Sequence, residues 1–193
     1  MTGSGQAGSN VSIALIHYPV YDKNRQVVAS AITNLDLHDI ARAARTYGLY
    51  RYYVVTPIAE QRDLAERIVG HWREGWGATY NPKRKAALEL TRVVDSLESA
   101  AAELYQHFGR PAKLVATGAQ ARPGSTSAGG LAEMIMDASQ PYLLLFGTGW
   151  GLADEVFGQA DYLLDPIRVM GDYNHLSVRS AAAIILDRLL GQR

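Results

Sequence analysis

Three glycines alternate with larger residues directly after a short apolar run in the C-terminal third of the chain. The apolar run covers residues 142–146, and the next five residues are Gly147, Thr148, Gly149, Trp150 and Gly151. An apolar run of this length that ends in glycines is typical of a strand buried in a parallel sheet. Glycine lets backbone approach a ligand closely, and parallel sheets bind ligands at the carboxyl ends of their strands. The segment therefore predicts a site for a flat or heterocyclic ligand.

Two further loops follow apolar runs in the same way. Thr117 and Gly118 come after the run 113–116, and the run 162–164 is ended by Asp165 and Pro166. Backbone N–H and C=O groups at such strand ends are free to bind the polar edge of such a ligand. From the residues alone, the alternative that the glycines only form a tight turn stays open. A dinucleotide fingerprint fails on spacing, because its third glycine would fall on Leu152.

Aromatic and basic residues are interleaved with glycines in the segment 71–85, which contains Lys83, Arg84 and Lys85. This mixture suits loop or single-stranded RNA, whose bases stack on rings and whose phosphates attract cations. The alternative, a solvated surface, stays open for the three basic residues. We expect Trp72 to lie in the core as the end of an amphipathic helix.

Composition limits the other classes of function. The 193 residues contain 19 Lys and Arg and 19 Asp and Glu, so an RNA contact needs a local patch or a dimer groove. There is no cysteine, and the five histidines show no metal-ligand spacing, so no metal site is expected. No apolar run approaches the length of a membrane span, and residues 1–10 lack a signal-peptide pattern. We expect a cytoplasmic protein.

Strand and helix patterns alternate along the chain. Strands are expected over residues 11–16, 27–31, 52–55, 93–94, 113–116, 142–146 and 162–164, and helices over 36–48, 60–72, 83–90, 97–108, 128–138 and 174–190. Asp36 is the expected N-cap of the first helix. The alternation predicts an α/β fold with a mostly parallel sheet and helices on both faces. We expect one domain over residues 11–193 after a flexible tail of residues 1–10.

The segments LLFGTGWGL (144–152) and DYNHLSVRS (172–180) resemble the C-terminal half of a SPOUT-class S-adenosylmethionine-dependent RNA methyltransferase. The likeness extends from about His17 to the C-terminus. It implies a deep C-terminal trefoil knot and methyl transfer from S-adenosylmethionine to RNA, either tRNA or rRNA. The cofactor-binding residues that it implies are Thr117, Gly118, Phe146, Gly147, Thr148, Gly149, Trp150, Pro166, Ile167, Asn174, His175, Leu176 and Ser177.

The first helix is similar to the N-terminal motif of the SpoU branch of this class. Arg42, Ala44 and Gly48 match that motif. The chain departs from the branch at four positions, where other residue types are expected: Asp36, His38, Gly149 and Ser177. These departures weigh against ribose 2′-O-methylation, but they are compatible with a guanidinium beside the methyl acceptor.

The resemblance also implies roles on the acceptor side. Arg42 is the candidate charge that stabilises a deprotonated acceptor, and Asp172 is the candidate base. The candidate substrate-binding residues are Asp36, His38, Lys83, Arg84, Lys85 and Arg122. Arg42 as an ordinary solvated helix residue is the alternative.

The last helix is apolar on more than one stripe, which predicts a homodimer. In the class that the chain resembles, a dimer brings the acceptor side of one subunit to the cofactor of the other. Two other functions stay open. One is a catalytically inactive knotted module that binds cofactor or RNA, and the other is a nucleotide- or NAD-binding enzyme.

Overall fold

A parallel sheet forms the centre of the computed structural model, which describes residues 10–168, 170–171 and 173–192. Within these residues the sheet has six strands in the order β5-β4-β1-β7-β6-β8, and each neighbouring pair is parallel. The strands are β1 (Val11–Ile16), β4 (Arg51–Val55), β5 (Thr91–Val94), β6 (Lys113–Ala116), β7 (Tyr142–Gly147) and β8 (Tyr162–Leu163). The predicted α/β fold with a mostly parallel sheet is confirmed.

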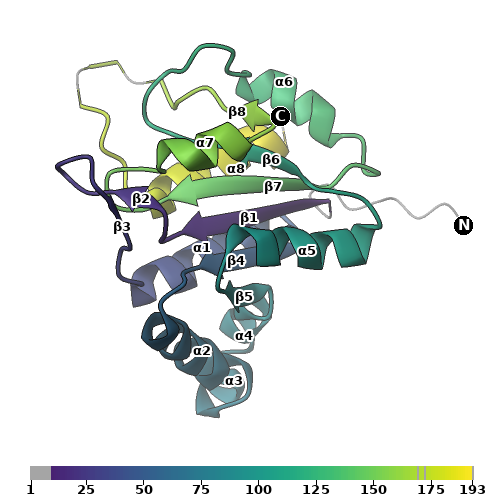
Figure 1. Cartoon of the computed structure of the whole chain (residues 1–193). Coiled ribbons are helices and arrows are strands. Elements are labelled where there is room, and N and C mark those ends of the chain that lie inside the picture. The colour runs from purple at the N-terminus through teal and green to yellow at the C-terminus, as the bar shows by residue number, and fades with distance from the viewer. Residues whose placement is uncertain (1–9, 169, 172, 193) are drawn as a thin grey trace, which may run out of the picture.

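Helices cover both faces of this sheet, as predicted (Figure 1). Buried residues of α1, α2, α4, α6 and α8 pack on one face, and those of α5 and α7 pack on the other. The helices are α1 (Asn34–Thr46), α2 (Ala59–Arg73), α3 (Trp76–Tyr80), α4 (Pro82–Leu88), α5 (Leu97–Phe108), α6 (Ala128–Ile135), α7 (Asp154–Gln159) and α8 (Val178–Leu190). Among the described residues, none of these helices has the length and apolar character needed to cross a bilayer.

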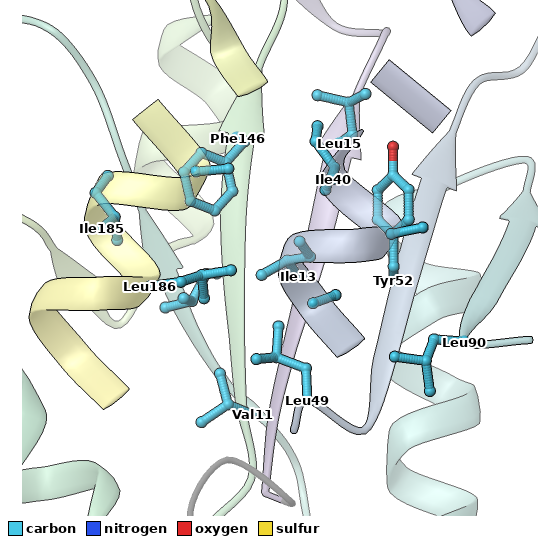
Figure 2. Packing of buried hydrophobic residues seen from close by; sticks show 14 of the residues in the cluster. Val11, Ile13, Leu15, Ile40, Leu49, Tyr52, Leu90, Phe146, Ile185 and Leu186 are labelled. Carbon is cyan, nitrogen blue, oxygen red and sulfur yellow. The ribbon is translucent and has the colours of Figure 1, made fainter. Parts of the chain in front are cut away.

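Strand β1 shows why the sheet needs helices on both of its faces. Its six residues are all buried, and successive side chains point to opposite faces. Ile13 and Leu15 belong to the core on one face, whereas Ile16 belongs to the core on the other. Figure 2 shows Ile13 between Ile40 of α1 and Leu186 of α8. Burial on both faces explains why every residue of β1 except Ser12 is apolar.

Two helices begin more than one residue away from their predicted starts. Thr33, rather than Asp36, is the N-cap of α1, because its hydroxyl oxygen accepts the N–H of Asp36. That hydroxyl also donates to Asp36 Oδ2 at 2.7 Å, so Asp36 completes a reciprocal cap from the third helical position. Likewise, α8 begins at Val178 with Ser177 as its N-cap, so the predicted start at Asn174 was four residues early.

A small hairpin lies outside the main sheet, and the sequence pattern predicted only one of its two strands. Strands β2 (Val20–Tyr21) and β3 (Val27–Val28) pair antiparallel, where the sequence predicted a single strand over 27–31. In Figure 1 the hairpin lies beside the carboxyl ends of β1 and β7. It is therefore positioned to form a wall of any site at that edge.

The periodicity of residues 60–72 predicts that Leu64, Ile68 and Trp72 form the buried stripe of this helix, but the stripe that α2 buries is shifted by one residue. Leu64 is exposed, whereas Ala65 and Val69 are buried, with Ile68 and Trp72 packed partly against the core. The helix therefore presents smaller residues to the sheet than the periodicity suggested.

The start of the folded chain also differs from the expected one. Asn10, expected in the tail, is 3% exposed, and its side-chain amide donates to the backbone carbonyls of Ile135, Asp137 and Gln140. These bonds make Asn10 part of the folded domain. Residues 1–9 lie outside the described part of the chain.

Candidate functional site

A cleft of about 850 Å³ opens at the carboxyl ends of β1, β7 and β6. Its walls come from the three loops that the sequence singled out and from the segment between β2 and α1. The cleft is lined by these expected cofactor residues: Thr117, Gly118, Phe146, Gly147, Thr148, Gly149, Trp150, Ile167, Asn174, His175, Leu176 and Ser177. Pro166 is half-buried beside them and does not line the cleft. The fold thus brings together residues that are 60 positions apart in the sequence (117 and 177).

The glycine turn has a shape that larger residues would not allow. A Cβ atom on Gly147 would lie 2.6 Å from the backbone nitrogen of Leu152. Gly149 has a φ of +58°, and a Cβ atom there would lie 3.0 Å from the carbonyl oxygen of Tyr21. The tight turn, one of the two interpretations left open by the sequence, is therefore real. It also forms a wall of the cleft, so a tight turn does not exclude a ligand site there.

A chain of hydrogen bonds leads from the buried His17 to the wall of the cleft. His17 Nδ1 lies 2.9 Å from Ser30 Oγ, which lies 2.5 Å from Thr148 Oγ1. Thr148 in turn donates to the carbonyl oxygen of Ile16 at 3.0 Å. Because each hydroxyl has a single proton, Ser30 must donate to Thr148 and His17 must donate to Ser30.

This chain requires a proton on Nδ1 of His17, and burial of the ring favours its neutral form. Burial lowers the pKa of His17 from 6.5 to about 4, and Asp36 and the bond to Ser30 only partly oppose that shift. Ser30 and Thr148 both line the cleft, and their protons are directed into the protein. Each hydroxyl therefore offers its remaining lone pair to a donor group on a ligand.

Arg179 lines the cleft with a positively charged side chain, although it was not among the predicted site residues. Its Nη1 atom lies 2.7 Å from Oδ1 of Asp36, and its Nε atom lies 3.6 Å from Oδ2 of Asp39. Asp36 and Arg179 both line the cleft. Arg42, the candidate charge, instead has a 64% exposed side chain 3.8 Å from Asp39 and does not line the cleft of its own chain.

The remaining substrate candidates fall into separate places. Arg122 lines the cleft and donates to Asp154 at 2.9 Å. His38 packs edge-on against Trp72, with a ring separation of 5.4 Å. Burial and, to a smaller extent, the nearby Arg84 lower the pKa of His38.

The basic segment belongs to α4, away from the residues that line the cleft. Arg84 lies over the ring of Trp72 at 4.5 Å, and Lys83 is exposed. Asp172, the candidate base, lies outside the described residues. Within the described residues, no three side chains of the metal-binding types gather into a possible ion site.

Comparison with known proteins identifies the class. The model of a family described as SAM-dependent RNA methyltransferase matches residues 10–191. A protein of Oleidesulfovibrio alaskensis named tRNA (guanine-N(1)-)-methyltransferase is 45% identical over 190 residues, which are 98% of this chain and 44% of that protein. An uncharacterised protein of Aquifex aeolicus is 40% identical over 183 residues, covering 95% of this chain and 89% of that protein. The chain thus spans less than half the length of the first relative.

Solved structures share the fold. A probable methyltransferase from Bordetella pertussis has a TM-score of 0.64 at 19% identity, over 95% of this chain and 96% of that one. A SpoU methyltransferase from Streptomyces viridochromogenes in complex with AdoMet has a TM-score of 0.59 at 18% identity, over 93% of this chain and 56% of that one. The resemblance to the SPOUT class is confirmed. The chain belongs to the family of SAM-dependent RNA methyltransferases.

Proposed function

We propose that this methyltransferase binds S-adenosylmethionine in the cleft at the carboxyl ends of β1, β7 and β6 and methylates tRNA. The observation that carries the proposal is the meeting of three loops at one cleft of about 850 Å³, a volume in the usual range for ligands of this size. The tRNA substrate is supported by the name of the Oleidesulfovibrio alaskensis relative, of which this chain spans 44%.

The residues present fit an adenosine-containing cofactor. Phe146, Leu152 and Ile185 supply apolar wall, and the glycine turn exposes backbone to the cleft. The hydroxyls of Ser30 and Thr148 offer lone pairs that match the ribose hydroxyls, the adenine amino group or the ammonium group of the cofactor. The expected cofactor residues named above, Pro166 included, are proposed to hold it.

The chemistry asks mainly for positioning. The bound cofactor supplies a methyl group on a positively charged sulfur, and the protein must hold the acceptor in line with it. Asp36 and Arg179 stand at the cleft, where Arg179 can stabilise negative charge on an acceptor and Asp36 keeps that guanidinium in place. Asp172 remains the proposed base, and Arg122 a proposed substrate contact.

We infer that the enzyme is a homodimer in which Arg42 reaches the cleft of the other subunit. The support is that Arg42 is exposed and absent from its own cleft, while two apolar side chains close to the Arg179–Asp36 pair in sequence are also exposed: Leu35 by 60% and Leu176 by 44%. The apolar stripes of α8 are weaker support than expected, since Ile185 and Leu186 are buried within the chain itself. Light scattering should give the mass of a dimer at micromolar concentration.

The trefoil knot is part of the same proposal. It is supported by links between the loop after β6 and the segment after β8. Thr126 donates its N–H to Leu163 and accepts the N–H of Asp165, and Asn174 donates to the carbonyl oxygen of Ala119 at 3.0 Å. Crossing of these segments would let the chain close around its cofactor. We also infer that the predicted single domain over residues 11–193, extended to include Asn10, acts as one unit and that the enzyme works in the cytoplasm on its RNA.

Two measurements test the function. Calorimetry should show binding of S-adenosylhomocysteine and no binding of NAD. Mass spectrometry of nucleosides from cells that lack the protein should show one methylated nucleoside missing from the tRNA fraction. A loss confined to rRNA would overturn the tRNA assignment, and binding of the cofactor with every nucleoside intact would favour the inactive module.

A further inference from the structure

The turn of the β2–β3 hairpin holds an arginine in an unfavourable backbone conformation. Arg25 has a φ of +62°, and it is the only non-glycine residue with positive φ in the described part of the chain. This conformation costs a non-glycine residue roughly 1–2 kcal/mol. The Asp22 carboxylate maintains the turn by accepting the N–H groups of Asn24 and Gln26, each at 2.8 Å. Glycine would adopt this backbone conformation at a lower cost in free energy. The presence of arginine therefore suggests that its side chain has a function.

Hydrogen bonds attach the hairpin to the glycine turn of the cleft. Tyr21 donates its N–H to the carbonyl oxygen of Gly151 at 2.9 Å and accepts the N–H of Trp150 at 3.0 Å. Its phenol oxygen accepts the N–H of Asp154 at 3.2 Å. Because Arg25 lies over the Tyr21 ring at 4.2 Å, these bonds hold its guanidinium at the cleft.

A second guanidinium reaches the same carboxylate from the loop after β6. Asp154 Oδ1 lies 2.9 Å from Nη2 of Arg122, and Asp154 Oδ2 lies 3.6 Å from Nη2 of Arg25. The guanidinium of Arg122 also lies over the Phe157 ring, at 3.6 Å. One carboxylate thus faces two guanidiniums, which leaves an excess positive charge. The two contacts engage one terminal nitrogen of each arginine, and a guanidinium has five N–H donors.

An exposed ring stands next to this pair. Trp150 lines the cleft, yet 65% of its surface is exposed. Guanidiniums bind phosphate through paired hydrogen bonds, and an exposed indole suits stacking with a base. We propose that Arg25 and Arg122 bind a backbone phosphate of the RNA beside the acceptor nucleotide, and that the Trp150 side chain stacks on a base there. This inference rests on the proposed function and adds the RNA contact at the mouth of the cleft.

The test uses the full chain, saturating S-adenosylhomocysteine and a short fluorescein-labelled single-stranded RNA, with anisotropy measured across a salt series. Arg25→Gly should relieve the backbone, so its melting temperature should be unchanged or higher while its RNA affinity falls several-fold. In the double variant Arg25→Gly/Arg122→Ala, the slope of log affinity against log salt should become shallower by about 0.7 for each phosphate that is no longer neutralised. Trp150→Ala should lower affinity without changing that slope. Arg110→Ala, an exposed arginine outside the cleft, is the matched control and should change neither.

Three results would overturn the proposal. The first is an RNA affinity and salt slope in the double variant equal to those of the wild type. The second is a loss of RNA affinity in the Arg110→Ala control as large as in the double variant. The third is a loss of S-adenosylhomocysteine affinity in the double variant as large as its loss of RNA affinity, which would show that the two arginines bind the cofactor. If the wild-type chain bound neither S-adenosylhomocysteine nor RNA, the proposed function itself would fail, and that outcome is visible before any variant is made.

Discussion

The Arg179 guanidinium and the Asp36 carboxylate form an ion pair, 2.7 Å apart, between helices α8 and α1. Asp36 is only 5% exposed, and its other oxygen accepts the hydroxyl of Thr33. The pair therefore fixes the first turn of α8 against the first turn of α1 at the cleft. It also gives the buried carboxylate the partners that a buried charge requires.

Removing the cation alone should be costly. We expect Arg179→Met to lower the free energy of unfolding by about 1–3 kcal/mol, because it leaves a buried carboxylate with one partner fewer. Arg42→Met, in the exposed pair with Asp39, should change it by less than about 0.5 kcal/mol. Urea unfolding measures both. Adding Asp36→Asn to Arg179→Met should restore part of the loss, and strictly additive effects would show that the two side chains do not interact.

Acid should destabilise the fold through His17. Its pKa is about 4 when folded and 6.5 by default when unfolded, so between these values the unfolded chain binds more protons. The stabilisation is complete above about pH 6.5 and is lost as the pH falls towards 4, by up to about 3 kcal/mol. Urea unfolding from pH 7 to pH 4.5 should show a shallower decline for His17→Asn. The exposed His71 provides the control, since His71→Asn should keep the wild-type decline.

Cofactor binding should be blocked from the loop after β6 without damage to the fold. A Cβ atom on Gly118 would meet the Phe157 ring at 3.5 Å, an ordinary contact, and Gly118 lines the cleft. Gly118→Leu should therefore fill part of the cleft and weaken S-adenosylhomocysteine binding by roughly tenfold or more, about 1.4 kcal/mol. Gly158→Leu, at an open position outside the cleft, is the calorimetric control. Equal affinities of the two variants would place the cofactor elsewhere.

A second RNA surface is expected on α3 and α4. Trp76 and Tyr80 are stacked at 4.7 Å and are 70% and 69% exposed, and Lys83 begins the basic segment that follows. We expect Lys83→Glu/Lys85→Glu to weaken RNA binding and to reduce its salt slope, because fewer counterions are released. Trp76→Ala should weaken binding at constant slope. If Arg110→Glu weakened RNA binding as much as the double lysine variant, the effect would be one of net charge only.

Most of the regular elements could be predicted because their signals are local, whereas the short helices α3 and α7 were not predicted. The apolar run 142–146 and the helical pattern over 97–108 depend on neighbours in sequence, and both elements are present in the structure. The loops of the site were predictable for the same reason, since each follows a buried strand.

The contacts inside the cleft were not predictable in this way. Arg179 meets Asp36 across 143 positions, and no spacing rule connects them. The resemblance to the SpoU motif drew attention to Arg42 instead, although within one chain that residue is outside the cleft. The hairpin was half missed because two-residue strands are too short to show a period of two. Composition identified the basic segment but carried no information on its distance from the glycine turn.

The bonds between Tyr21 and the glycine turn have a thermodynamic consequence. A ligand that orders the turn also orders the hairpin, since Tyr21 is bonded to both Trp150 and Gly151. Binding of the cofactor in the cleft and binding of RNA at Arg25 should then be linked by a coupling free energy. Such coupling is reciprocal: the factor by which S-adenosylhomocysteine changes RNA affinity must equal the factor by which RNA changes S-adenosylhomocysteine affinity. The hairpin would thereby couple the affinities for the two substrates to the same degree, whichever of them binds first.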